Sequence, residues 1–95
     1  MIDSSRVERR ITVDDVTWHV VVSGTGPALL LLHGTGASAH SWDPMWDAMR
    51  DSLAASYTVI APDLPGHGRT SALTQRATLP AMSRAVAGLC TALGV

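Results

Sequence analysis

Lysine is absent from the 95-residue sequence, and cysteine occurs only once, as Cys90. Because every basic residue is an arginine, chemistry that requires a lysine, such as a lysine-dependent phosphate loop or a Schiff base, is excluded. A single cysteine cannot form an internal disulfide, which favours a reducing compartment. We therefore expect a cytoplasmic protein, and we expect it to use no cofactor and no metal ion.

Charged residues are also scarce, at 16% of the chain against about a quarter in ordinary domains. This deficit predicts that part of the surface is buried by polypeptide outside these residues. The net charge of -1 gives no reason to expect nucleic acid or an anionic membrane as a partner. No targeting or membrane segment is recognisable, since residues 1–10 are polar and charged and the apolar run 28–32 is too short to span a bilayer.

Leucine occupies four consecutive positions, 29–32, and His33-Gly34-Thr35-Gly36 follows at once. Successive side chains of a strand point to opposite faces, so the run predicts a strand covered on both faces, as in a parallel α/β sheet. The two glycines predict a tight turn from this strand into a helix. Such a turn brings several backbone N–H groups to one point, which can hold an anion or a developing oxyanion.

Two further strands are expected before the leucine run. Residues 7–12 and 16–22 are joined at Asp14-Asp15, a sequence typical of a hairpin turn, so we expect them to pair antiparallel. His19 lies within the second of these strands. A single polar residue in a strand is usually partly exposed, and this is what we expect for His19.

Two amphipathic helices are expected after the glycine turn. The apolar face of the first should carry Trp42, Trp46, Met49 and Leu53. Ser41 is its expected N-cap, and residues 57–61 form the next expected strand. The second helix should begin after Thr78 as N-cap, start its apolar face at Leu79 and end at Gly94. The order β-β-β-α-β-α predicts one α/β domain with an antiparallel start followed by parallel strands.

One interpretation of the glycine turn is a dinucleotide-binding, Rossmann-type module. Residues 34–39 match G-x-G-x-x-A after a strand, and Asp63 ends the next expected strand, about where an acid that binds a ribose would lie. Two features count against this interpretation. A hairpin precedes the unit, and His33 occupies a position where a small residue usually lies beside the cofactor.

Two motifs taken together favour a different interpretation. His33-Gly34-Thr35-Gly36 follows one apolar strand, and Pro62-Asp63-Leu64-Pro65-Gly66-His67-Gly68 follows the next. Over nearly the whole chain they resemble the α/β-hydrolase fold family. The resemblance implies that the turn supplies a backbone N–H to an oxyanion hole, with Thr35 as the donor and Gly36 as the alternative. It implies a structural role for the other motif residues, which are His33, Gly34, Asp63, Gly66, His67 and Gly68.

For two of these residues the loop itself suggests a role. We expect Asp63 to accept backbone N–H bonds within its own loop, as Asp does in turns, and His67 to be structural or to lie at the rim of a pocket. The segments 33–42, 61–68 and 79–82 also resemble the hydrolase-fold accessory proteins of magnesium chelatase in bacteriochlorophyll biosynthesis. That resemblance implies an association with magnesium chelatase, in addition to a small-molecule substrate.

The nucleophile of the hydrolase family lies in a G-x-S-x-G elbow, which this sequence lacks. The nearest segment, 36–40, has no final glycine and follows the wrong strand, so Ser38 is not expected to be the nucleophile. We therefore expect 1–95 to be the N-terminal part of a single hydrolase domain, truncated before the elbow and inactive alone. The expected reaction is ester or amide hydrolysis by a serine beyond Val95. The alternatives are the dinucleotide module and a hydrolase-fold binding protein without catalysis.

Overall fold

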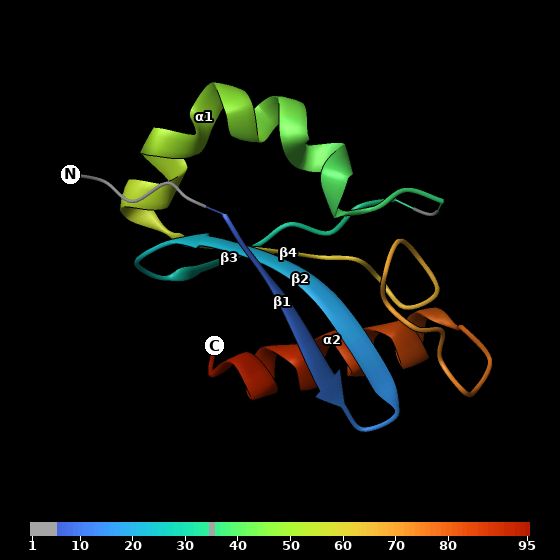
Figure 1. Cartoon of the computed structure of the whole chain (residues 1–95). Coiled ribbons are helices and arrows are strands. Elements are labelled where there is room, and N and C mark those ends of the chain that lie inside the picture. Colours follow the sequence, from blue (N-terminus) through green and yellow to red (C-terminus); the bar gives the residue numbers. More distant parts are fainter. Residues whose placement is uncertain (1–5, 35) are drawn as a thin grey trace.

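A computed structural model describes residues 6–34 and 36–95 of the chain, and Figure 1 shows how they fold. In chain order the elements are β1 (Val7–Val13), β2 (Val16–Gly24), β3 (Ala28–Leu30), the 3-10 helix η1 (Ala39–Trp42), α1 (Asp43–Ser56), β4 (Thr58–Pro62) and α2 (Leu79–Leu93). The predicted order of strands and helices is confirmed, with a short 3-10 helix added before α1.

The four strands form one mixed sheet in the order β1-β2-β4-β3. β1 and β2 pair antiparallel with Val13 opposite Val16, so the two aspartates between them are the whole hairpin loop. Asp14 adopts a φ of 54°, a left-handed conformation that such loops require and that Asp tolerates. β2 also pairs antiparallel with β4, whereas β3 and β4 are parallel. The predicted antiparallel start and parallel continuation are confirmed.

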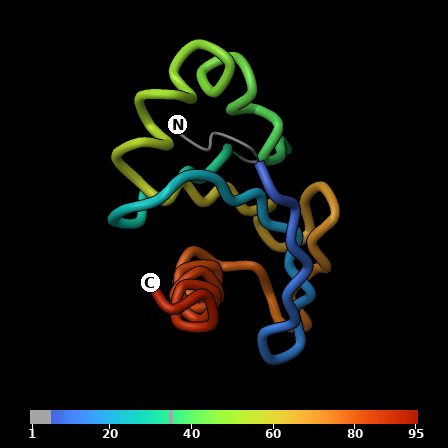
Figure 2. Tube along the Cα trace, turned by 60° about the vertical axis from the view of Figure 1, so that its left-hand side comes forward, coloured from blue at the N-terminus to red at the C-terminus, as the bar shows by residue number. Residues whose placement is uncertain are grey.

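The two long helices cover opposite faces of the sheet (Figures 1 and 2). One buried cluster joins the sheet to α2 and consists of Val16, Trp18, Val20, Ile60 and Leu89. On the other face, Trp46 of α1 packs with Val59 of β4. Because consecutive strand residues point to opposite faces, β2 contributes Val20 to the first layer and Val21 to the second. The sheet is therefore the middle of three layers.

The leucine run is covered less completely than its sequence predicts. β3 ends at Leu30, although the Leu31 N–H still donates to the Ile60 carbonyl over 2.9 Å. The Leu32 side chain is 43% exposed. Within the described residues β3 is an edge strand that pairs with β4 alone, so one of its sides has no neighbouring strand to cover it. Leu30 packs with the cluster under α2, and Leu29 and Leu31 pack with the cluster under α1, so the strand is covered on both faces as predicted, and only the exposed Leu32 departs from the expectation.

The start of α1 also differs from the prediction. Ser41 is not its N-cap, because the chain first makes the 3-10 turn η1, and Ser38 caps that turn by accepting the His40 N–H over 3.3 Å. α1 then begins at Asp43. The helix packs on the sheet through Trp46 and Ala54, eight residues apart, which leaves Met49 at the margin with an exposed fraction of 48%.

The boundaries of α2 are confirmed. The Thr78 hydroxyl accepts the Ala81 N–H over 3.2 Å, and Gly94 ends the helix with a φ of 78°. Leu79 departs from its expected place on the apolar face, since it is 84% exposed and borders an open groove described below. Neither α2 nor any other helix within residues 6–34 and 36–95 has the length and apolar character to cross a membrane.

Candidate active site

The glycine turn that the sequence singles out connects β3 to η1. Thr35, the predicted oxyanion donor, lies outside the described residues. Gly36, the alternative donor, adopts a φ of 80°, a conformation that glycine reaches without steric cost. The Ala37 N–H donates to the Gly34 carbonyl over 3.1 Å and closes the turn. The backbone therefore reverses tightly between the strand and the short helix.

His33 fixes the first end of this turn. Its side chain is buried, and its Nδ1 lies 2.7 Å from the Gly34 carbonyl oxygen, to which it must donate because a carbonyl only accepts. Its Nε2 accepts the Leu64 N–H over 2.9 Å. These two contacts require the neutral imidazole with its proton on Nδ1. His33 thus ties the turn to the loop that follows β4.

Asp63 fixes the other end of the turn. The residue is only 2% exposed, and one carboxylate oxygen, Oδ1, accepts the Ala39 N–H over 2.7 Å. The second oxygen, Oδ2, accepts the Arg69 N–H over 3.0 Å and the Nδ1–H of His19 over 2.9 Å. The bond from Arg69 lies within the loop of Asp63, as its sequence position predicts. The bonds from Ala39 and His19 join that loop to two distant segments.

The charge of Asp63 is maintained by these donors. Burial alone would raise the pKa of its carboxyl group, but the backbone N–H groups of Ala39 and Arg69, together with His19, outweigh burial and hold the pKa below its ordinary value. Asp63 is therefore a buried carboxylate whose ionised form is supported by hydrogen bonds from three parts of the chain.

His19 contradicts its sequence prediction. It is 8% exposed instead of partly exposed, because its ring turns toward Asp63 and its backbone N–H donates to the Thr70 hydroxyl over 2.9 Å. Its Nε2 lies 3.3 Å from a Glu8 carboxylate oxygen but outside hydrogen-bond geometry. The partner Asp63 is 44 residues away in the sequence, so no local pattern around His19 could have revealed the pair.

Close packing of the loop around Asp63 requires glycine at position 68. Gly68 has a φ of 50°, and a Cβ there would lie 2.3 Å from Asp63 Oδ2. Gly66 also has a positive φ, of 79°, but a Cβ at that position would meet its nearest neighbour at 3.9 Å. The two positions of the loop therefore require glycine for different reasons. Gly66 allows the backbone turn, whereas Gly68 also allows the carboxylate to approach.

An open groove lies beside the turn and has a volume of about 730 Å³. His33 and Gly34 of the turn, the loop after β4 and the first turns of α2 line it. His67 stands at this groove, with its ring centroid 5.1 Å from that of His33 and its Nδ1 donating to the Pro65 carbonyl over 3.1 Å. Among the described residues that line the groove, none is Asp, Glu, Arg or Lys. The groove is therefore a mainly apolar space with two imidazole rings at one end.

The geometry of Asp63 disfavours the dinucleotide interpretation. A ribose hydroxyl would need an accessible carboxylate oxygen, but Asp63 is only 2% exposed and both of its oxygens accept N–H bonds inside the protein. A hairpin also precedes β3 in the sheet, in the position predicted from the sequence. Within the described residues, no group of three or more His, Cys, Asp or Glu side chains could hold a metal ion.

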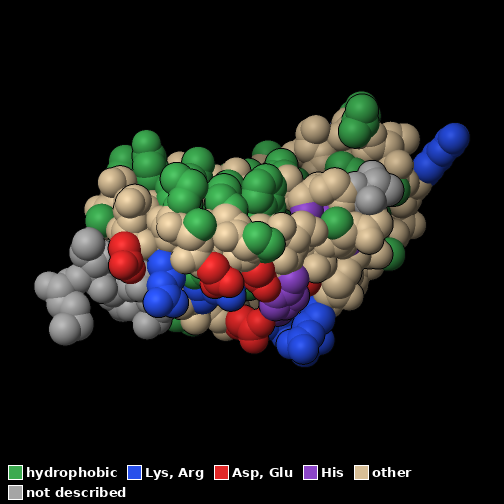
Figure 3. Space-filling view, turned by 90° about the horizontal axis from the view of Figure 1, so that it is seen from above, with side chains coloured by type: hydrophobic (Ala, Val, Ile, Leu, Met, Phe, Trp, Pro, Cys, Tyr) green, Lys and Arg blue, Asp and Glu red, His purple; other side chains and the backbone are tan. Residues whose placement is uncertain are grey.

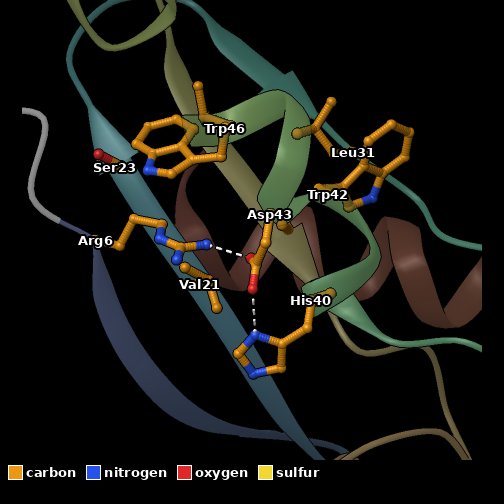
Figure 4. A pocket seen from close by; sticks show the side chains of 11 residues that line it. Arg6, Val21, Ser23, Leu31, His40, Trp42, Asp43 and Trp46 are labelled. Atoms are coloured by element: carbon orange, nitrogen blue, oxygen red, sulfur yellow. Dashed lines mark hydrogen bonds and ion pairs between the residues drawn. The ribbon is translucent and has the colours of Figure 1, made fainter. Parts of the chain in front are cut away.

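A second polar cluster lies where β1 begins, beside the start of α1 (Figure 4). Arg6 donates to Asp43 over 2.7 Å, and His40 Nδ1 lies 3.1 Å from the other Asp43 oxygen. Arg6, and to a smaller degree His40, hold the pKa of the Asp43 carboxyl below its ordinary value, although burial opposes them. The pocket beside the cluster has a volume of only about 20 Å³, room for a water molecule and not for a substrate.

Comparison with known proteins identifies a family for most of the chain. A sequence profile of the alpha/beta hydrolase family matches residues 29–94. The chain is 43% identical to the magnesium-chelatase 30 kDa subunit of Rhodobacter capsulatus over 97% of its own length and 31% of that protein. It is 49% identical to a fluoroacetate dehalogenase of a Burkholderia species over 67% of its length and 20% of that protein.

Among solved structures, an epoxide hydrolase from Vigna radiata matches with a TM-score of 0.81 and 30% identity, over 95% of this chain and 29% of that one. The chain therefore spans less than a third of the length of each of these relatives.

Proposed function

The chain belongs to the alpha/beta hydrolase family, and we propose that it is the N-terminal part of a hydrolase domain whose nucleophile lies beyond Val95 in the whole protein. The observation that carries this proposal is the glycine turn held at both ends by the loop after β4. A turn that is fixed before substrate binds can present a backbone N–H to an oxyanion without reorganisation.

The exposed apolar surface supports the presence of further chain in the whole protein. Seen from the α1 side, charged side chains gather along one long edge of the molecule and hydrophobic side chains along the opposite edge (Figure 3). Within the described residues β3 pairs on one side only, and large hydrophobic side chains are exposed at Leu32, Met49, Tyr57 and Leu79. A further strand beside β3 would cover an edge of this kind.

The proposed reaction is hydrolysis of an ester or amide in a small-molecule substrate. A serine beyond Val95 attacks the carbonyl carbon while a histidine, also beyond Val95, takes the hydroxyl proton and later passes it to the leaving group. The carbonyl oxygen becomes an oxyanion that accepts the backbone N–H of Thr35, or of Gly36 as the alternative. Collapse of this intermediate expels the alcohol or amine and leaves an acyl-enzyme. Water then attacks the acyl-enzyme, releases the acid and restores the serine. His33, Gly34, Asp63, Gly66, His67 and Gly68 hold the turn and its loop in place.

A second candidate function is association with magnesium chelatase in the cytoplasm. The 43% identity to the magnesium-chelatase 30 kDa subunit extends over 97% of this chain, which favours this candidate. The two functions are compatible, because a hydrolase domain can also bind a partner. A third candidate is a hydrolase-fold protein that binds a ligand without catalysis, and an experiment must distinguish it from a hydrolase and from a protein that associates with magnesium chelatase.

The test of the proposed function uses the whole protein. Its sequence after Val95 should contain a G-x-S-x-G after another apolar strand, and the protein should hydrolyse an activated ester such as p-nitrophenyl acetate. Replacing the serine of that motif by alanine should abolish turnover, while the 95-residue chain alone should show none. A whole protein without the elbow serine, or one that hydrolyses no ester, contradicts the proposed reaction. Co-purification with magnesium chelatase subunits tests the second candidate independently.

A further inference from the structure

Two neighbouring residues of the loop after β4 hold the two ends of the glycine turn. Leu64 donates its N–H to His33 at the start of the turn, over 2.9 Å. Asp63 accepts the Ala39 N–H at the end of the turn, over 2.7 Å. Within the described residues, the turn is therefore attached to the loop after β4 at both of these contacts. The position of the turn therefore depends on the direction in which the Asp63 carboxylate points.

His19 controls that direction from a third segment, β2. Its Nδ1–H donates to Oδ2 of Asp63, which also accepts the Arg69 N–H from its own loop, and Oδ1 faces the Ala39 N–H. The backbone of His19 is held as well, because its carbonyl accepts the Asp63 N–H over 2.9 Å. The side chains of His19 and Asp63 are only 10% and 2% exposed. At such burial, water has little access to replace a hydrogen bond that is lost.

We propose that His19 is a positioning residue for the oxyanion turn, acting through Asp63 and Ala39 without touching the substrate. This inference rests on the proposed hydrolase function for its effect on rate. Without the Nδ1–H of His19, Oδ2 of Asp63 keeps only the Arg69 N–H from its own loop, so the carboxylate is no longer tied to β2 and its hydrogen bond to the Ala39 N–H is weakened. The end of the turn then shifts, and a displacement of about 1 Å at a reacting group can cost about a hundredfold in rate.

The test compares two substitutions of His19 in the whole protein. His19→Leu removes the N–H donor and keeps an apolar side chain. His19→Asn retains the donor, because the amide nitrogen of Asn and the Nδ1 of His are both two bonds from Cβ. His40→Leu is the matched control, since His40 also faces a carboxylate, that of Asp43, but its side chain is 61% exposed.

Two readouts distinguish positioning from general support of the fold. In His19→Leu, kcat should fall by about tenfold or more with KM within about twofold, and His19→Asn should recover most of the loss. Hydrogen exchange of the Ala39 amide, followed by NMR in the same proteins, should become faster in His19→Leu alone. His40→Leu should leave both quantities at the parental values.

A folded His19→Leu protein with parental kcat or parental exchange at Ala39 overturns the proposal. If the whole protein hydrolyses no ester, the proposed function fails, whereas the exchange rate at Ala39 still decides whether His19 positions the turn. If His19→Leu does not fold, His19→Asn and His19→Gln give the same comparison, because Gln places its N–H one bond further from the backbone. Equal exchange rates in these two variants then contradict the proposal.

Discussion

Two Asp–His pairs contact η1, and their nitrogen–oxygen distances are nearly equal, at 2.9 Å for Asp63–His19 and 3.1 Å for Asp43–His40. Their surroundings differ. The side chains of the first pair are 2% and 10% exposed, and those of the second are 35% and 61% exposed. The buried carboxylate also accepts two backbone N–H groups, whereas the exposed one shares its charge with Arg6. The same two residue types therefore fix backbone geometry in one place and form a solvated surface contact in the other.

The largest expected effect is the loss of stability when the buried carboxylate of Asp63 is removed. Asp63→Ala in the whole protein leaves the backbone N–H groups of Ala39 and Arg69 and the His19 N–H without their acceptor, and should cost about 3 kcal/mol or more of stability. Asp43→Ala should cost about 1 kcal/mol or less, because water replaces its lost contacts. Denaturant unfolding of both variants measures the difference. Equal losses would contradict the distinction between the two pairs.

The second prediction concerns the approach of the loop backbone to Asp63. Gly68→Ala introduces a Cβ 2.3 Å from the carboxylate and also forces alanine into a positive φ, so it should cost about 2–3 kcal/mol. Gly66→Ala imposes a similar φ without a close contact and should cost only about 1–2 kcal/mol. The melting temperatures of the two variants measure which one is less stable. A Gly66→Ala protein less stable than Gly68→Ala would show that the close approach is not the constraint.

The third prediction concerns how the free energy of unfolding depends on pH in variants of the two pairs. The folded-state pKa of Asp63 lies below the ordinary value of 3.8, so its charge contributes stability above that pH, and the contribution is lost as pH falls through the folded-state pKa. The parent should therefore lose stability below about pH 4 more steeply than Asp63→Asn, which cannot titrate at this position. Asp43→Asn should change the slope less, because its partner Arg6 is exposed and screened. Unfolding free energies between about pH 2 and pH 6 measure these slopes.

The smallest expected effect is the coupling between Arg6 and Asp43. A double-mutant cycle with Arg6→Ala and Asp43→Ala should give about 1 kcal/mol or less, and 1 M salt should reduce it further. Part of the Arg6 effect should survive salt, since its guanidinium lies 5.8 Å from the Trp46 ring centroid. A coupling energy between Arg6 and Asp43 as large as the stability lost in Asp63→Ala would contradict the assignment of Asp43 to a solvated surface contact.

Local signals in the sequence account for what could be predicted. The aspartate pair between two β-rich runs specifies the hairpin, and Thr78 and Gly94 bound α2 where capping rules place them. Asp63 was expected to accept N–H bonds in its loop because Asp does so in turns, and the Arg69 N–H is such a donor. Each of these features depends on residues within a few positions of one another.

What could not be predicted depends on contacts between distant residues. His19 is buried because Asp63 faces it from 44 positions away, and the turn is held through Ala39, 24 positions from Asp63. The four leucines predict a strand covered on both faces, which holds for Leu29, Leu30 and Leu31, whereas the exposure of Leu32 accompanies the place of β3 at the edge of the described sheet, a property of topology and not of composition. Ser41 is not the N-cap of α1 because the 3-10 turn η1 precedes the helix and places Trp42 at the N-cap, and such a turn has no strong sequence pattern.

The central claim is that the glycine turn supplies a backbone N–H to an oxyanion, and one pair of substitutions at Thr35 tests it most directly. Thr35→Ala keeps the backbone N–H, so kcat of the whole protein on an activated ester should be nearly unchanged in this variant. Thr35→Pro removes the N–H, so kcat of this variant should fall by about a hundredfold or more, at a melting temperature close to that of the parent. A well-folded Thr35→Pro protein with the parental kcat would contradict the claim for Thr35 and would leave Gly36 as the remaining candidate donor.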